Sequence, residues 1–329
     1  MKPYSDKEQA DAQEQPKKSD PEPSKGLAGE RIQKVLARGG VGSRREVERW
    51  ISEGLLNLNG LPVKLGDRLT EGDTLSLKGR PLRWEKFGVQ PTQVLIYHKP
   101  TGEVVTRNDP EGRPVVFKKL PKLQTGRWIA VGRLDINTQG LLLFTNNGEL
   151  ANRLMHPSSE IDREYAVRIL GEVSDDHIAQ LKKGVQLEDG LAKFDDIQFN
   201  GGEGANRWYH VTVTEGRNRL VRRLWEALDF QVSRLMRVRY GPIFLPDGLS
   251  ARQTHELTAK ELDDLLSFVD LPLERFDNKV QVRSAPVKRQ AKPKVSLSEK
   301  SEMRRSKHVA NRDQEARKPS HHKNKRPRR

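Results

Sequence analysis

Apolar residues are distributed unevenly along this chain, and this limits the part of it that can fold around a core. The last 49 residues, 281–329, contain 17 Lys or Arg against four Asp or Glu, a net charge of +13, and no Phe, Trp or Tyr. Such a segment cannot bury enough apolar surface to offset its loss of chain entropy. We therefore predict a basic disordered tail over 273–329 and a disordered leader over 1–28, with the folded region between them.

The composition restricts the partners and the chemistry. The whole chain carries a formal net charge of +15, which favours a polyanionic partner, either nucleic acid or an anionic membrane surface. Cysteine is absent, so disulfides and thiolate metal sites are excluded. We find neither a signal peptide nor an apolar run near the roughly 20 residues that span a bilayer. We expect a cytoplasmic protein without a membrane segment, and a monomer, because no long apolar edge suggests an interface.

Residues 29–78 have the pattern of a small domain with two helices and a strand hairpin. The apolar residues within 32–36 have the i, i+3, i+4 spacing of one helix face. Ser43 and Glu46 have the spacing of a capping box, which predicts the start of a second helix. Asn59–Gly60 lies between two apolar runs and predicts a tight turn between two strands.

Basic side chains gather on or near the two expected helices. They are Arg31, Lys34, Arg38, Arg44, Arg45 and Arg49. Taken alone, they could be an ordinary solvated face or a surface for the phosphates of folded RNA. The stretches Gln33–Arg38 and Ser43–Glu46 resemble those of S4 RNA-binding domains. The resemblance implies that these six side chains contact RNA.

After an expected linker over 79–91, the pattern changes to short β-branched runs with few helices. We predict strands at Val94–Tyr97, Leu141–Thr145, Tyr165–Ile169, Tyr209–Thr214 and Val232–Tyr240, and helices at Glu149–Met155 and Leu220–Leu228. Irregular spacing argues against repeated strand-helix-strand units. Residues 92–272 therefore predict an α+β domain built on a mostly antiparallel sheet.

Three features of this second domain could carry chemistry. Asp135 lies in a glycine-bounded loop before an apolar strand, where it could enter a cleft or simply cap a turn. Tyr165 opens another strand, where its ring could stack on a base or pack in the core. Arg219 and Arg222 share one face of the helix that follows Gly216, where they could bind anions or remain solvated.

In this order, the segments resemble the pseudouridine synthases that act on ribosomal RNA. The stretch Gly132–Leu142 carries the motif with the essential Asp, so the resemblance makes Asp135 the catalytic residue. It also implies that Tyr165 packs on the flipped target base and that Arg222 forms an ion pair with Asp135. Arg133 and Arg219 would then lie near the RNA backbone. The stretch His98–Gly102 matches an opening Lys-Pro motif that is usually structural.

Longer strings narrow the resemblance within the family. Residues 106–114, 150–157 and 201–204 resemble the branch that modifies large-subunit (23S) ribosomal RNA. The reaction is an isomerisation, so no cofactor or metal is expected, and no phosphate-binding or zinc-binding motif is present in the sequence. Two alternatives remain open: the same chemistry on small-subunit rRNA or tRNA, and a noncatalytic RNA-binding factor for ribosome assembly. Asp135 could act as a nucleophile or as a base.

Overall fold

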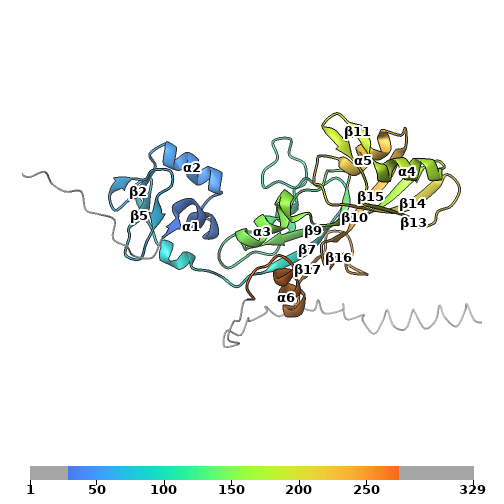
Figure 1. The fold of residues 1–329 in the computed structure, drawn as a ribbon. Coiled ribbons are helices and arrows are strands. Elements are labelled where there is room, and N and C mark those ends of the chain that lie inside the picture. Colours follow the sequence, from blue (N-terminus) through green and yellow to red (C-terminus); the bar gives the residue numbers. More distant parts are fainter. Residues whose placement is uncertain (1–28, 274–329) are drawn as a thin grey trace, which may run out of the picture. The chain divides into compact units, whose positions relative to one another are not determined.

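The structure is a computed structural model that describes residues 29–273 (Figure 1). The leader expected over 1–28, and the tail expected over 273–329 apart from residue 273, lie outside the described residues. No helix within residues 29–273 has the length and hydropathy needed to cross a bilayer.

The first domain begins with two short helices, α1 (Ile32–Arg38) and α2 (Arg44–Ser52). The expected apolar face of α1 is buried: Ile32, Val35 and Leu36 are at most 2% exposed. The capping box is confirmed, because the Ser43 hydroxyl accepts from the Glu46 backbone N–H and the Glu46 carboxylate accepts from the Ser43 backbone N–H, both at 3.1 Å.

Short strands complete this domain. A four-stranded sheet has the order β3-β2-β5-β6, and β1 pairs with β4. Their bounds are β1 (Glu30–Arg31), β2 (Leu56–Leu58), β3 (Leu61–Pro62), β4 (Arg68–Leu69), β5 (Leu75–Leu77) and β6 (Arg80–Leu82). The turn between β2 and β3 is confirmed: Asn59 and Gly60 both have positive φ, at 52° and 85°, as the tight hairpin turn requires.

The segment expected to be a linker, 79–91, has more structure than the sequence suggested. It contains β6 and a 3₁₀ helix, Trp84–Phe87. The Trp84 indole N–H donates to the carbonyl oxygen of Asp73 at 2.9 Å, and the rings of Trp84 and Phe87 pack against the core of the first domain. The two prolines and the mixed polarity of 79–91 favoured a linker over a packed segment. The linker prediction was therefore wrong for 80–87.

The second domain is built on a nine-stranded sheet, in which seven strands follow the order β13-β14-β10-β15-β9-β7-β17. Its strands are β7 (Val94–Lys99), β8 (Ile129–Ala130), β9 (Gln139–Thr145), β10 (Arg163–Leu170), β13 (Asp196–Phe199), β14 (Asn206–Val213), β15 (Gln231–Tyr240), β16 (Ile243–Phe244) and β17 (Thr254–Glu256). All pairs in it are antiparallel except β9 with β15, which confirms the predicted fold class.

Helices cover separate parts of this sheet (Figure 1). They are α3 (Gly148–Met155), α4 (Asp175–Lys183), α5 (Leu220–Glu226) and α6 (Ala259–Phe268), with 3₁₀ helices at Val116–Lys119 and Pro157–Ser159 and a hairpin of β11 (Val185–Leu187) and β12 (Gly190–Ala192). Apolar residues of α4 and α5 form one core with β10, β14 and β15. Those of α3 and α6 form another with β7 and β9.

The two halves of the sheet meet where β9 runs parallel to β15. Only two residue pairs join these strands, Met236 with Gln139 and Arg237 with Gly140. Gly140 has a φ of +103°, and a Cβ there would lie 2.2 Å from the Arg237 carbonyl oxygen. Only glycine allows this close approach without strain. The junction places the loop that precedes β9, residues 132–138, over the centre of the sheet.

Candidate functional site

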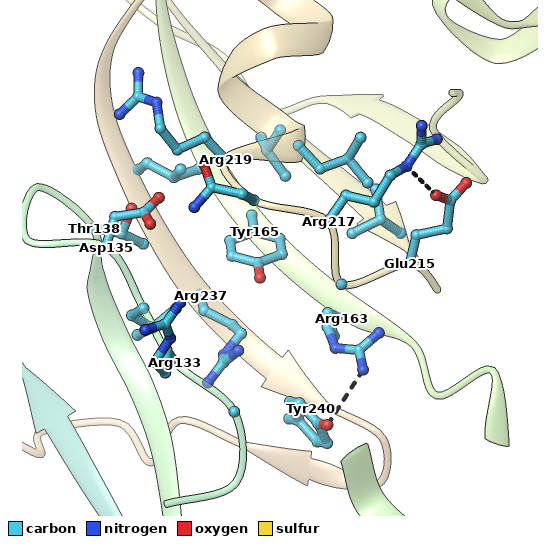
Figure 2. Close-up of a pocket in the computed structure, with 18 of the residues that line it drawn as sticks. Arg133, Asp135, Thr138, Arg163, Tyr165, Glu215, Arg217, Arg219, Arg237 and Tyr240 are labelled. Atoms are coloured by element: carbon cyan, nitrogen blue, oxygen red, sulfur yellow. Dashed lines mark hydrogen bonds and ion pairs between the residues drawn. The ribbon is translucent and has the colours of Figure 1, made fainter. Parts of the chain in front are cut away.

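A pocket of about 470 Å³ opens at this junction. Four segments supply most of its walls: the loop before β9, the start of β10, the loop that leads into α5, and β15 (Figure 2). The side chains from these segments include Asp135, Tyr165, Arg133 and Arg219. The fold therefore brings together four of the residues that the sequence singled out, from three separate stretches of chain.

A buried lysine holds the Asp135 loop. Lys99, the last residue of β7, is 0% exposed, and its ammonium group donates to the carbonyl oxygens of Pro100, Asp135 and Thr138 at 3.0, 2.9 and 2.8 Å. Burial lowers the pKa of Lys99 to about 8, while the carboxylates of Glu103 and Asp135 oppose that shift. The lysine thus holds the backbone at Asp135 and at Thr138, while the Asp135 side chain stays partly exposed to the pocket.

Arg222 lies near Asp135 without the expected ion pair. Its two terminal nitrogens donate to the carbonyl oxygens of Val232 and Asn137, both at 3.0 Å. Burial and the charge of Arg219 lower the pKa of Arg222, against which the carboxylates of Asp135 and Glu226 act. The contact to Asn137 replaces the predicted side-chain pair, so in this structure Arg222 supports the Asp135 loop through its backbone.

Tyr165 forms part of the pocket floor. On β10 it pairs across the sheet with Val211 on one side and Arg237 on the other. Its ring is only partly buried and packs against two core clusters of the domain. In Figure 2 the hydroxyl end of the ring points toward the side of the pocket where Arg163, Arg237 and Tyr240 lie. The position combines packing against the core with access to the pocket.

The other two predicted arginines of this domain, Arg133 and Arg219, are both exposed. Arg133 is exposed at the pocket and has no carboxylate within 4 Å in the part of the chain described. Arg219 precedes α5 and forms an exposed ion pair with Glu226 at 3.3 Å, which is weak in water. Arg223 instead binds both oxygens of Asp189 at 2.9 Å and ties α5 to the β11–β12 hairpin.

In the first domain, the six basic side chains are not equally available. Lys34 and Arg38 both pair with Glu30, at 3.0 and 2.5 Å. Arg49 lies 3.7 Å from Glu53. The remaining three are exposed and form no ion pair within residues 29–273; they are Arg31, Arg44 and Arg45. The expected basic surface therefore reduces to these three cations and the partly neutralised group around Glu30.

Two pocket residues were missed as site residues. Arg163 and Arg237 line the pocket and lie 5.1 Å from the centre of the Tyr240 ring. Their strands also carry Arg168, Arg234 and Arg239, so nothing in the sequence marks which arginines face the pocket. Only the β10–β15 register, with its shift between Glu164 and Tyr165, sets this orientation.

Several known proteins are similar to this chain in sequence and in fold. A family model described as RNA pseudouridylate synthase matches residues 93–227, and an S4 domain model matches residues 30–75. Ribosomal large subunit pseudouridine synthase B of Escherichia coli strain K12 is 58% identical over 247 residues, which cover 74% of this chain and 85% of that protein. The chain belongs to the RNA pseudouridylate synthase family. It is an RNA pseudouridine synthase that carries an S4 domain, as the sequence resemblance predicted.

Further relatives agree with this assignment. The protein of the same name from Pseudomonas aeruginosa is 59% identical over 244 residues, which cover 74% of this chain and 63% of that longer relative. Among solved structures, one described as a pseudouridylate synthase superposes with a TM-score of 0.51 at 25% identity, covering 72% of this chain and all of the other.

No cluster of three or more His, Asp or Glu side chains in the described residues is arranged to hold a metal ion.

Proposed function

We propose that this chain isomerises uridine to pseudouridine in large-subunit (23S) ribosomal RNA, as a monomer in the cytoplasm. The similar proteins from Escherichia coli and Pseudomonas aeruginosa are both named for the large ribosomal subunit. One observation supports this chemistry most directly. The partly exposed side chain of Asp135 lines the pocket, and a buried lysine holds the loop to which Asp135 belongs.

The reaction needs an ionised carboxylate beside a flipped nucleotide. The C1′–N1 bond of the uridine breaks, the uracil turns, and C5 bonds to C1′ while its proton leaves and N1 gains one. A carboxylate can assist by adding to the ribose or base, or by removing a ribose proton. We assign that role to Asp135. Within the described residues, three pocket arginines have no carboxylate partner, Arg133, Arg163 and Arg237, and they surround the site with positive charge.

The target base must leave its stack to reach Asp135, at a cost of a few kcal/mol. Stacking on an aromatic ring contributes about 1–3 kcal/mol per base. The half-buried ring of Tyr165 at the pocket floor is suited to that contact. Arg133 and Arg219 are exposed at the same pocket, where each can bind a phosphate beside the flipped base. Arg222 would hold the Asp135 loop during turnover.

The first domain would bind folded RNA outside the active site. Arg31, Arg44 and Arg45 are exposed cations that form no ion pair within residues 29–273. Lys34, Arg38 and Arg49 would exchange their carboxylate partners for phosphates. Exposed ion pairs are worth at most about 1 kcal/mol, so this exchange costs little. A noncatalytic RNA-binding role would need the same surface but would leave the Asp135 pocket without a purpose.

The test is carbodiimide-adduct primer extension across both ribosomal RNAs and the tRNAs. Wild-type cells, a deletion strain, and a strain carrying Asp135→Asn are compared, with RNA binding measured on the purified variant. We expect one or more stops in large-subunit rRNA to vanish in both mutant strains while Asp135→Asn still binds RNA. Stops lost from small-subunit rRNA or tRNA would support the same chemistry on another substrate. Unchanged stops everywhere would overturn the proposed substrate.

A further inference from the structure

Arg237 is a buried cation on the floor of the pocket. Its side chain is 2% exposed, and the residue pairs across the sheet with Tyr165. Its Nε donates to the carbonyl oxygen of Leu141 at 2.8 Å, and its guanidinium lies 5.1 Å from the centre of the Tyr240 ring. These contacts fix the guanidinium at the junction between the two halves of the sheet, directly beside the ring proposed to stack on the base.

The charge of Arg237 is not neutralised. No carboxylate lies within 4 Å of it in residues 29–273, and its Nη2 atom is buried without a hydrogen-bond partner. Arg239, two residues along the same strand, shows the ordinary arrangement: it binds Glu164 at 2.9 Å and Asp162 at 3.5 Å. A buried cation without an anion is costly, and such sites commonly bind a charged or polar ligand.

The depth of Arg237 indicates which part of an RNA it meets. Phosphates carry a full charge and remain partly hydrated, so the exposed Arg133 and Arg219 suit them better. A base inserted against the Tyr165 ring reaches the floor instead. When the C1′–N1 bond breaks, the bonding electron pair passes to the uracil and its charge spreads over N1 and the two carbonyl oxygens. A buried donor stabilises such an oxygen far more than water does.

We propose that Arg237 is a substrate-binding residue that donates to a carbonyl oxygen of the target uracil and stabilises the negative charge on the detached base. This inference rests on the proposed function, because it requires a uridine in the pocket. Addition of Asp135 to the base would also place negative charge on a uracil oxygen. The role of Arg237 is therefore the same in either route.

The test is single-turnover pseudouridine formation on an in vitro transcript that contains the uridine mapped by primer extension. The variants are Arg237→Gln and Arg237→Lys, with Arg239→Gln as the matched control. The register shift between Glu164 and Tyr165 places Arg239 on the opposite face of the strand from Arg237. Loss of one such donor costs about 10²–10³ in rate. We expect that loss for Arg237→Gln, an RNA Kd within about threefold of wild type, and partial recovery in Arg237→Lys. Added guanidinium ions should raise the rate of Arg237→Gln alone.

The controls separate three results. If wild type does not convert the transcript, the proposed function fails, and this inference fails with it. If wild type is active and Arg237→Gln keeps its rate within threefold, the proposed function stands and this inference is wrong. If Arg237→Gln loses both rate and thermal stability, and neither lysine nor guanidinium restores the rate, Arg237 is only a packing residue and the inference is again overturned.

Discussion

At the scale of single residues, Lys99 determines the shape of the Asp135 loop, and its charge can be titrated. Its pKa is about 8, below the ordinary 10.5, chiefly because of burial. Between these values the unfolded chain binds more protons at this site than the folded chain does. The free energy of unfolding of wild type, relative to Lys99→Met, should therefore rise as pH increases from about 8 to 10.5.

Activity should change in the opposite direction over the same range. Above pH 8 the Lys99 ammonium group loses a proton and becomes a neutral amine with two N–H donors in place of three. Its hydrogen bonds to the loop carbonyls therefore weaken. We expect turnover to fall with an apparent pKa near 8. Turnover by Lys99→Met should be at least tenfold slower than by wild type and should not fall over this pH range. The checks are urea denaturation and rate measurements from pH 7 to 10. A fall in turnover that persists in Lys99→Met would contradict the assignment.

At the scale of elements, the short parallel contact between β9 and β15 depends on Gly140. Gly140→Ala places a methyl group against the Arg237 backbone and imposes a positive φ on a non-glycine residue. Such strain costs of order 1–3 kcal/mol, and the displaced junction carries the Asp135 loop. We expect Gly140→Ala to lower the free energy of unfolding by at least about 1 kcal/mol and turnover by more than tenfold.

Gly148→Ala is the matched control for that prediction. Gly148 is the first residue of α3, and the nearest atom to an added Cβ, from Ile129, lies 3.6 Å away. Its free energy of unfolding should stay within about 0.5 kcal/mol of wild type. Urea denaturation measures both variants. Equal stability and activity in the two would show that β9 and β15 do not need their close approach.

The elements also show how far the sequence could be read. Elements with a clear apolar pattern were predicted within a few residues of their bounds, such as α1 with its periodic apolar face and β9 with its continuous apolar run. The region 80–87 was misread because its two aromatic anchors, Trp84 and Phe87, form no periodic apolar pattern. The site was predicted only in part: Asp135 and Tyr165 lie in recognisable motifs, whereas Arg237 depends on a register shift between β10 and β15. Strand register across distant segments is a tertiary property.

At the scale of the whole molecule, positive charge has two separate placements. Within the pocket, the positive charge belongs to buried or constrained arginines, which are placed to stabilise negative charge at particular atoms of the substrate. Along 281–329 it is a matter of composition, with 17 Lys or Arg and four Asp or Glu. Charge of the second kind acts on RNA affinity through counterion release and carries no base specificity. Affinity and catalysis should therefore be separable by truncation.

Removal of residues 281–329 tests this separation. Each phosphate neutralised contributes about 0.7–0.9 to the slope of log K against log salt. If the 17 cations of this segment neutralise even three phosphates, the slope for rRNA binding should fall by about 2 in the truncated chain. Single-turnover rates at saturating enzyme should stay within twofold of wild type.

A control of equal length, with Gln in place of each Lys and Arg of 281–329, distinguishes charge from chain length. It should behave like the truncated protein, because counterion release depends on charge. Equal slopes for all three chains would show that the basic segment does not bind the RNA. In that case affinity must come from the basic side chains of the two folded domains, with Arg31, Arg44, Arg45 and Arg133 as the first candidates. A fall in rate under saturating conditions would instead show that the segment acts on the catalytic step.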